Sequence, residues 1–270
     1  MRKAGKIIVA AALLSLGAAA IIAATTLTTA APATDAERVR FTAGNGLQSE
    51  YHVYAAGVPQ PAGLLIWMHG DGAWEFDHPD DPAVMGGPDG VRAQALAQGY
   101  LVVSALAPDS AGTVTWWERG APNADYMAEL IDHLRARYGI DSNDIVMAGF
   151  SGGAQFTTQY FLPAHSGMLE GGGSIVFGGG GTPETSEQQP WNEELQPRFF
   201  MHWATGELDD AEHSDEGYDG IGEARRGVDY YAGEGFDTSY EWIPGRDHDL
   251  DGLFGAIVGE QLRAHAAARP

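Results

Sequence analysis

Cysteine is absent from this chain of 270 residues. Its absence excludes disulfide bonds, thiolate metal sites and attachment of a lipid to a cysteine. Paired cysteines are a common sign of an oxidising compartment, and that sign is missing here. Any prediction that the protein is exported must therefore come from another part of the sequence.

Basic residues are scarce. The chain has 15 Lys and Arg against 37 Asp and Glu, which gives a net charge of −22 at pH 7. Lys3 and Lys6 are the only lysines, and every acidic residue lies after residue 33. Nucleic acid is excluded as a favoured partner because a phosphate backbone attracts the opposite charge. The acidity indicates a well-solvated surface, or an adaptation to a salty medium whose ions screen the repulsion.

Long apolar segments are missing too, with one exception at the N-terminus. Residues 7–27 are almost entirely apolar, follow three basic residues and precede the small residues 28–33. This pattern predicts a signal peptide over residues 1–33 and hence a secreted protein. The run approaches the roughly 20 residues that span a bilayer, so an uncleaved membrane anchor is the alternative. Residues 34–270 suffice for a single domain with one large core.

Strand-like and helix-like segments alternate along the rest of the chain. Two continuous apolar runs, 64–68 and 100–106, are typical of strands buried on both faces. We expect strands at 38–41, 51–55, 64–68, 100–106, 144–148, 173–177, 199–204 and 238–243, and helices at 90–99, 124–138, 151–162, 217–232 and 253–267. This order predicts an α/β domain with a mostly parallel sheet and helices on both faces. Functional residues are then expected at the carboxyl ends of the strands.

A serine between two glycines stands where an expected strand meets an expected helix. Gly149, Ser151 and Gly153 form the pattern G-x-S-x-G. A sharp strand-to-helix turn strains the serine backbone, and the two glycines supply the room that this turn needs. Such a turn raises the hydroxyl above the sheet and sets the N–H of Gly152 beside it. An ordinary glycine-rich turn is the alternative, so the argument depends on the strand before the motif and the helix after it.

With this motif in this context, the chain resembles the α/β-hydrolase superfamily. Within that superfamily it is most similar to secreted esterases of the polyhydroxyalkanoate-depolymerase and feruloyl-esterase type. The resemblance runs from Leu64 to the end of the chain and includes the tryptophans Trp116 and Trp117. It implies the fold, a serine nucleophile and hydrolysis of carboxylic esters.

The resemblance also implies an oxyanion loop after the strand at 64–68, where the sequence reads His69-Gly70-Asp71-Gly72. The implied donors are the backbone N–H groups of Asp71 or Gly72 together with that of Gly152. We expect His69 to pack against or brace this loop rather than to act as the base.

In this fold the catalytic residues follow the chain order serine, acid, histidine. After the strand at 199–204 the sequence reads Gly206-Glu207-Leu208-Asp209-Asp210, and the family's Gly-x-x-Asp pattern selects Asp209 as the acid. Asp210 and Glu207 stay open as alternatives. The carboxylate would orient the imidazole and stabilise its charged form without itself becoming protonated.

His248 is the histidine that follows the last expected strand and precedes the last expected helix, where the fold carries its base. The surrounding residues 247–252 also fit the first half of a calcium loop. Such a loop needs a glutamate at its twelfth position, where this chain has Val258, and a helix rather than a strand before it. We therefore interpret His248 as a general base. Calcium at Asp247, Asp249 and Asp251, or at residues 77–81, is the alternative.

Together these residues predict a serine hydrolase that cleaves carboxylic esters through an acyl-enzyme intermediate. It needs no cofactor and no metal, and its expected partner is a small-molecule or polymeric ester. The candidates for substrate contact are Trp116, Trp117 and Tyr160, although core packing is the commoner role of such aromatic residues. A peptidase of the prolyl-peptidase type and a non-catalytic binding protein on the same fold are the rival interpretations.

Overall fold

The computed structural model describes residues 34–59, 62–108, 112–214, 217–250 and 252–269. The expected signal peptide or anchor, residues 1–33, lies outside the described residues, and so does Asp251. Among the helices that the structure describes, none combines the length and the apolar character needed to cross a membrane.

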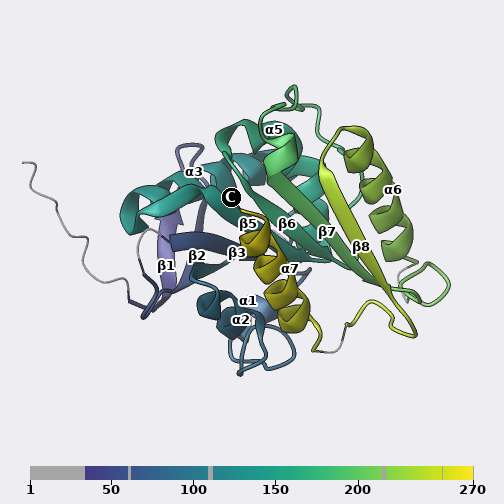
Figure 1. Ribbon diagram of the computed structural model, residues 1–270, viewed down its shortest axis with the longest axis horizontal. Helices are drawn as coiled ribbons and strands as arrows, with labels where there is room; N and C mark the ends of the chain where they lie inside the picture. Colours follow the sequence, from purple (N-terminus) through teal and green to yellow (C-terminus); the bar gives the residue numbers. More distant parts are fainter. Residues whose placement is uncertain (1–33, 60–61, 109–111, 215–216, 251, 270) are drawn as a thin grey trace, which may run out of the picture.

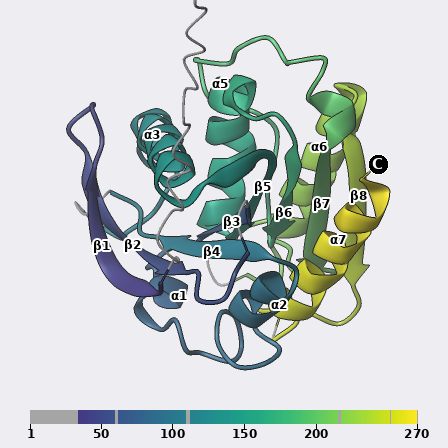
Figure 2. The same ribbon diagram turned by 60° about the vertical axis from the view of Figure 1, so that its left-hand side comes forward.

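One sheet of eight strands organises the protein, in the order β1-β2-β4-β3-β5-β6-β7-β8 (Figure 1; β4 is labelled in Figure 2). The strand β2 pairs antiparallel with β1 and β4, and every neighbouring pair from β4 to β8 is parallel. The strands are β1 (Ala36–Thr42), β2 (Gln48–Tyr54), β3 (Ala62–Met68), β4 (Tyr100–Ala105), β5 (Ile140–Phe150), β6 (Gly172–Phe177), β7 (Phe199–Gly206) and β8 (Asp237–Ile243). The mostly parallel sheet expected from the sequence is confirmed.

The central strands are apolar because helices cover both of their faces. All seven residues of β3 and all six of β4 are buried. The parallel register sets Trp67 of β3 beside Ser104 of β4 and Ala148 of β5, so that a bulky side chain has small neighbours. Burying one large apolar side chain contributes about 1.5–3 kcal/mol, which makes this continuous run the centre of the core.

Two helical layers enclose the sheet (Figure 2). One layer contains α3 (Gly120–Tyr138), α6 (Gly220–Gly233) and the helical segment that follows Ser151; its core includes the expected face of α3, with Met127, Leu130, Ile131 and Leu134 fully buried. The other layer contains α2 (Val91–Ala97) and α7 (Phe254–Ala268), which pack on the opposite face of β3 to β7. Helices on both faces were expected, and the structure confirms them.

The helix expected over 151–162 is divided into three parts. The structure has α4 (Gly152–Gln155), a π-helical segment η1 (Phe156–Phe161) and α5 (Leu162–His165), followed by the 3₁₀ turn η2 (Ser166–Met168). Pro163 has no N–H group, so it cannot continue the ladder of i to i−4 hydrogen bonds. The hydroxyls of Thr157 and Thr158 donate to the carbonyls of Gly153 and Ala154, which adds competing bonds along the same stretch. These local features account for the interruption.

Other differences from the expected elements are small. The helix expected at 124–138 begins four residues earlier, at Gly120, and the strand expected at 144–148 extends to 140 and 150. A short helix α1 (Trp74–Asp77) and the 3₁₀ turn η3 (Gln196–Arg198) were not expected.

Parallel pairing brings several strand ends to one edge of the sheet. The register sets Phe150 of β5 beside Phe177 of β6, Phe177 beside Ala204 of β7, and Gly206 beside Ile243 at the end of β8. The loops that follow β3, β5, β7 and β8 therefore meet at that edge.

Candidate active site

Ser151 lies in a strained turn between β5 and α4. Its backbone has φ 49° and ψ −114°, a conformation that non-glycine residues rarely adopt. The flanking glycines permit this turn. A Cβ at Gly149 would lie 2.7 Å from the carbonyl carbon of Gly153, and a Cβ at Gly153 would lie 2.2 Å from the carbonyl oxygen of Met68. A larger residue at Gly149 would push α4 away from β5, and one at Gly153 would push α4 away from β3.

Hydrogen bonds join Ser151, His248 and Asp209 in a continuous chain. Nε2 of His248 lies 2.9 Å from Oγ of Ser151, and Nδ1 lies 2.9 Å from Oδ2 and 3.0 Å from Oδ1 of Asp209. A carboxylate can only accept, so Nδ1 carries the proton and Nε2 is free to accept from the serine hydroxyl. The Asp209 side chain is 1% exposed and that of His248 is 37% exposed. The imidazole can therefore receive the serine proton and remain accessible to a substrate.

Packing on several sides fixes the imidazole of His248. The ring of Phe150 lies 4.9 Å from it between centroids, and the ring of Tyr218 meets it edge-on at 5.6 Å. Gly178 approaches so closely that a Cβ there would lie 3.0 Å from Cε1 of His248. The ring position depends on these contacts as well as on Asp209.

The two alternative acids point elsewhere. Oδ1 of Asp210 lies 2.8 Å from Nδ1 of His213, and the hydrogen bond between them lowers the pKa of Asp210 and raises that of His213. Glu207 is exposed at the start of the same loop. Of the three acids that the sequence offers, only Asp209 contacts His248.

The loop after β3 presents one usable backbone donor rather than a choice of two. The N–H of Gly72 donates to the carbonyl of Val114 at 2.9 Å, so this candidate donor is already occupied and the expectation for Gly72 is wrong. Outside the regular helices and strands of the described residues, the N–H groups of Asp71 and Gly152 donate to no backbone carbonyl. They are the pair that can bind an oxyanion at Ser151.

His69 braces this loop from the inside. It is fully buried, its Nδ1–H donates to the carbonyl of Gly70 at 2.6 Å, and its Nε2 accepts from the N–H of Ala107 at 3.0 Å. Burial lowers the pKa of His69 to about 4, so the ring is neutral at pH 7. Both ring nitrogens are engaged, which leaves none to serve as a base for Ser151.

A cavity of about 590 Å³ opens over Ser151. Besides Ser151, His248 and Asp209, it is lined by Asp71, Trp117, Phe150, Gln155, Leu208, His213, Ser214, Tyr218, Asp247 and Asp249. Of the three aromatic residues proposed from the sequence, Trp117 is in this lining and is 37% exposed.

Trp116 and Tyr160 are not among the residues that line this cavity; both pack on the core, and a role for them in substrate contact stays a prediction. Trp116 is fully buried in the core, where its ring stacks on Phe156 at 4.9 Å and lies 5.4 Å from the ring of His69. The ring of Tyr160 packs against Gly120, and a Cβ at that glycine would lie 2.2 Å from it. Both side chains fix α3 and the segment after Ser151 against each other.

Tyr218, Gln155 and Phe150 also line the cavity and were not expected from the sequence. Phe150 and Gln155 stand one residue before and four after Ser151, so the motif itself could have pointed to them. Tyr218 comes from the later part of the loop between β7 and α6, after the Gly-x-x-Asp pattern has ended, and only the fold brings it to His248.

The acids beside His248 do not form a metal site with other described residues. Across the ranges that the structure describes, no group of three or more His, Asp or Glu side chains could hold a metal ion. Asp251, one member of the calcium alternative, lies outside those ranges.

Comparison with known proteins gives a sequence relative and several structural neighbours. No family model matches the chain. A bifunctional acetylxylan esterase/xylanase, XynS20E, from Neocallimastix patriciarum is 28% identical over 113 residues, which cover 42% of this chain and 16% of that protein. The match thus spans only a small part of that longer protein.

Two carboxylesterases resemble the structure over most of its length. The Bacillus cereus enzyme has a TM-score of 0.59 at 18% identity and matches 82% of this chain and 94% of its own. The Mesorhizobium loti enzyme has a TM-score of 0.58 at 16% identity and matches 79% and 94%. The sheet order, the two helical layers and this likeness show that the chain has the α/β-hydrolase fold.

Proposed function

We propose that this protein is a serine hydrolase that cleaves carboxylic esters, with Ser151 as nucleophile, His248 as general base and Asp209 as the acid. The observation that carries the proposal is the chain of hydrogen bonds from Ser151 through His248 to Asp209, at 2.9 Å on each side of the imidazole. The likeness to carboxylesterases and the partial match to an acetylxylan esterase support an ester as the substrate.

The first half of the reaction transfers the acyl group to the enzyme. The Ser151 hydroxyl gives its proton to Nε2 of His248 while Oγ bonds to the ester carbonyl carbon. The carbonyl oxygen becomes an oxyanion that accepts from the N–H groups of Asp71 and Gly152. The C–O bond to the alcohol then breaks, and the imidazolium returns its proton to the leaving alcohol. The buried carboxylate of Asp209 stabilises the imidazolium and stays ionised.

The second half releases the acid. Water gives a proton to Nε2 of His248 and its oxygen attacks the acyl carbon. The bond from that carbon to Oγ breaks, and the proton passes from His248 to Ser151. Leu208 and the aromatic rings of Trp117, Phe150 and Tyr218 are the apolar part of the cavity lining, and the remaining lining is polar. This small apolar surface favours short acyl groups.

Labelling with a fluorophosphonate probe tests the nucleophile. We expect wild type to be labelled and Ser151→Ala not to be. In parallel, the two proteins are assayed on p-nitrophenyl acetate and on an aminoacyl-proline amide, with wild type expected to turn over only the ester. An unlabelled wild type would remove the serine mechanism and favour the non-catalytic rival, and preferential amide cleavage would favour the peptidase.

We also propose that residues 1–33 direct export and are removed. Three basic residues, the apolar stretch 7–27 and the small residues after it support this. Expression of the full chain in a bacterial host, followed by N-terminal sequencing of the extracellular and membrane fractions, checks it. A mature N-terminus near residue 34 in the extracellular fraction is expected, whereas an intact N-terminus in the membrane fraction supports the anchor.

A further inference from the structure

The cavity over Ser151 carries negative charge on several sides. Four of its lining residues are aspartates: Asp71, Asp209, Asp247 and Asp249. No Arg or Lys occurs among the described residues that line it. The hydrogen-bonded serine and histidine, three aromatic rings and these aspartates therefore line one cavity.

Asp71 is fixed at the inner end of the cavity. Its carboxylate accepts from Oγ1 of Thr115 at 2.5 Å and from Nε1 of Trp117 at 3.0 Å. It also lies directly against the residue after the nucleophile, since a Cβ at Gly152 would be 2.1 Å from Oδ1. The two neutral donors orient the charge without cancelling it. A group that extends from a carbonyl bound at Ser151 along this wall therefore meets a carboxylate.

Asp247 places a second charge at the rim. It immediately precedes His248, is exposed, and its Oδ1 accepts from the backbone N–H of Asp249 at 3.1 Å. It lies close enough to His213 to contribute to the raised pKa of that imidazole, although the hydrogen bond from Asp210 is the larger cause. His213 pairs with Asp210, and a pair of a cation and an anion adds no net positive charge.

Aromatic rings stand among these carboxylates. Trp117, Phe150 and Tyr218 all line the cavity, and Nε1 of Trp117 is turned toward Asp71. The face of an aromatic ring attracts a cation, and quaternary ammonium groups are often recognised between such rings. Carboxylates and the faces of aromatic rings therefore both attract a positively charged ligand.

We propose that this site selects esters by charge: it prefers an ester with a cationic group near the scissile bond to an uncharged isostere, and it rejects an ester with an anionic group there. The proposal rests on the ester hydrolysis proposed above. A cationic group on the ester is attracted by the fixed aspartates and by the aromatic rings. A carboxylate on the ester would have to give up its hydration next to groups of the same charge.

Three acetates of similar size test the selection. Acetylcholine is cationic, 3,3-dimethylbutyl acetate has carbon in place of nitrogen, and 4-acetoxybutanoate is anionic. At about 20 mM salt we expect kcat/KM to fall at least about fivefold at each step in that order, and the differences to contract at about 1 M, where the Debye length is about 3 Å. Equal kcat/KM values for the three at low salt would overturn the selection. Failure to turn over any of the three acetates would overturn the proposed function instead.

Matched variants locate the effect. We expect Asp71→Asn/Asp247→Asn to reduce the ratio of kcat/KM for acetylcholine to that for 4-acetoxybutanoate about tenfold. The control Glu193→Gln/Glu194→Gln removes the same charge from exposed residues before β7, at the opposite edge of the sheet, and should leave the ratio unchanged. An equal fall in the control would assign the preference to the net charge of the whole protein and overturn the role of the cavity. Asp247→Asn alone, in an exposed turn, gives the same test if the double variant does not fold.

Discussion

Two histidines at the same edge of the sheet have opposite environments. His69 is buried, its two ring nitrogens are engaged by backbone groups, and its pKa is lowered to about 4. His248 is partly exposed and turns one nitrogen to a carboxylate and the other to a hydroxyl. Residue type alone therefore says little about a role in catalysis, and the partners of each nitrogen decide it.

Adjacent aspartates allow a matched test of the acid. Asp209→Asn keeps the size of the side chain but removes the charge that orients and stabilises the imidazolium, so kcat should fall by about 10⁴ with little change in KM. Asp210→Asn changes the neighbouring residue, which contacts His213 instead, and should stay within about twofold of wild type. Steady-state kinetics on p-nitrophenyl acetate measures both. A larger loss from Asp210→Asn would reverse the assignment.

Adjacent tryptophans allow a second matched test. Trp116→Ala removes a fully buried ring and should lower the free energy of unfolding by about 3–5 kcal/mol. Trp117→Ala removes a partly exposed ring from the cavity wall and should raise KM roughly tenfold while costing less than about 1 kcal/mol of stability. Urea denaturation and ester kinetics of the two variants separate these outcomes. A stable Trp116→Ala protein with raised KM would contradict the structure.

At this scale the sequence was informative where chemistry requires a pattern. The glycines around Ser151 are required by close backbone contacts, so their spacing predicts the turn. Whether Trp116 or Trp117 faces the core depends on the path of the loop after β4, and no local pattern determines that path. Gly72 was an equally good donor by sequence, and only the tertiary contact with Val114 excludes it.

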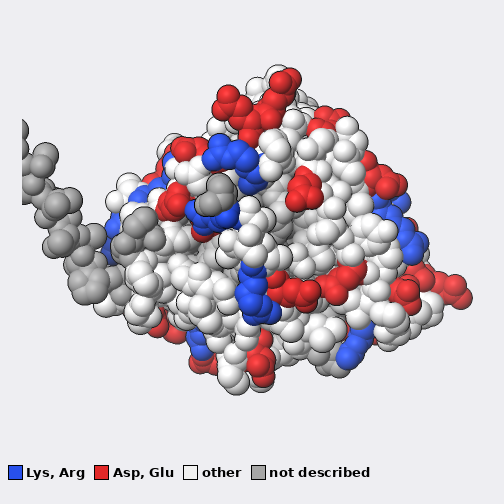
Figure 3. Space-filling view, viewed as in Figure 1, with Lys and Arg blue, Asp and Glu red and all other residues white. Residues whose placement is uncertain are grey.

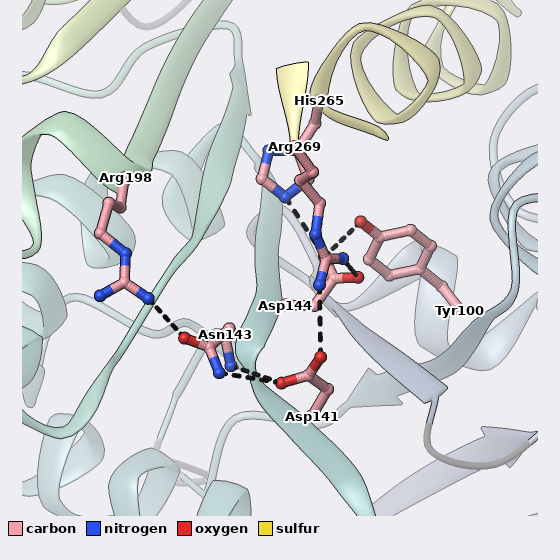
Figure 4. A network of polar contacts seen from close by, with 7 residues as sticks. All are labelled: Tyr100, Asp141, Asn143, Asp144, Arg198, His265 and Arg269. Carbon is pink, nitrogen blue, oxygen red and sulfur yellow. Dashed lines mark hydrogen bonds and ion pairs between the residues drawn. The ribbon is translucent and has the colours of Figure 1, made fainter. Parts of the chain in front are cut away.

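Among the elements, the C-terminal helix is held by a partly buried ionic cluster around Asp144 (Figure 4). Asp144 of β5 accepts from the hydroxyl of Tyr100 at 2.5 Å, lies 3.3 Å from Nε2 of His265 on α7, and forms an ion pair with Arg269 just after that helix. Arg269 also contacts Asp141 at 3.3 Å. The cluster joins β4, β5 and α7.

The pKa of Asp144 gives the pH dependence of this cluster. Burial acts to raise it, but the hydrogen bonds from His265 and Tyr100 and the charge of Arg269 outweigh burial and lower it. A lowered folded-state pKa stabilises the fold above the unfolded value of about 3.9, and this stabilisation is lost as pH falls through the folded value. We expect Asp144→Asn to cost about 2 kcal/mol at pH 7 and clearly less at pH 3.

Urea denaturation of wild type and Asp144→Asn at both pH values measures this difference. Asp132→Asn, an exposed acid on α3, serves as the control and should change stability by less than about 0.5 kcal/mol. A cost for Asp144→Asn that is the same at pH 3 as at pH 7 would show that the carboxylate charge does not stabilise the helix.

Helices and strands were predicted correctly where the regular spacing of apolar residues continued over a long segment without interruption. The face of α3 and the buried run of β3 were both expected, because each repeats over several residues against a continuous partner surface. The π-helical segment after Ser151 was not expected, because its sequence keeps the apolar spacing of an α-helix. Only Pro163 hints that the hydrogen bonds there must shift.

Over the whole molecule, acidic side chains dominate, with a net charge of −22. Figure 3 shows basic side chains scattered among acidic ones over one face. If repulsion among the acids limits stability, NaCl should raise the unfolding midpoint by about 5 °C between about 0.05 M and 1 M, because the Debye length falls to about 3 Å. Thermal melts followed by circular dichroism measure the midpoint. An unfolding midpoint that stays constant or falls with NaCl concentration would contradict adaptation to a salty medium. It would favour the other interpretation, a well-solvated surface.

The overall architecture was predictable only in part. Alternating strands and helices indicate a mostly parallel sheet, and the structure agrees. The strand order was not predicted, since β4 lies between β2 and β3 and such crossings depend on which distant apolar faces fit together. The meeting of Ser151, Asp209 and His248 followed from the family resemblance rather than from any local pattern.

The serine and the histidine that it contacts are 97 positions apart, and the histidine and its aspartate are 39 apart. They meet only after β5, β6, β7 and β8 have aligned. Under the proposed mechanism, turnover is therefore a sensitive measure of assembly. If β8 separates from the sheet, Ser151 keeps its hydroxyl but has no imidazole to receive the proton. An agent that unfolds this side of the sheet should therefore abolish activity before the rest of the protein unfolds.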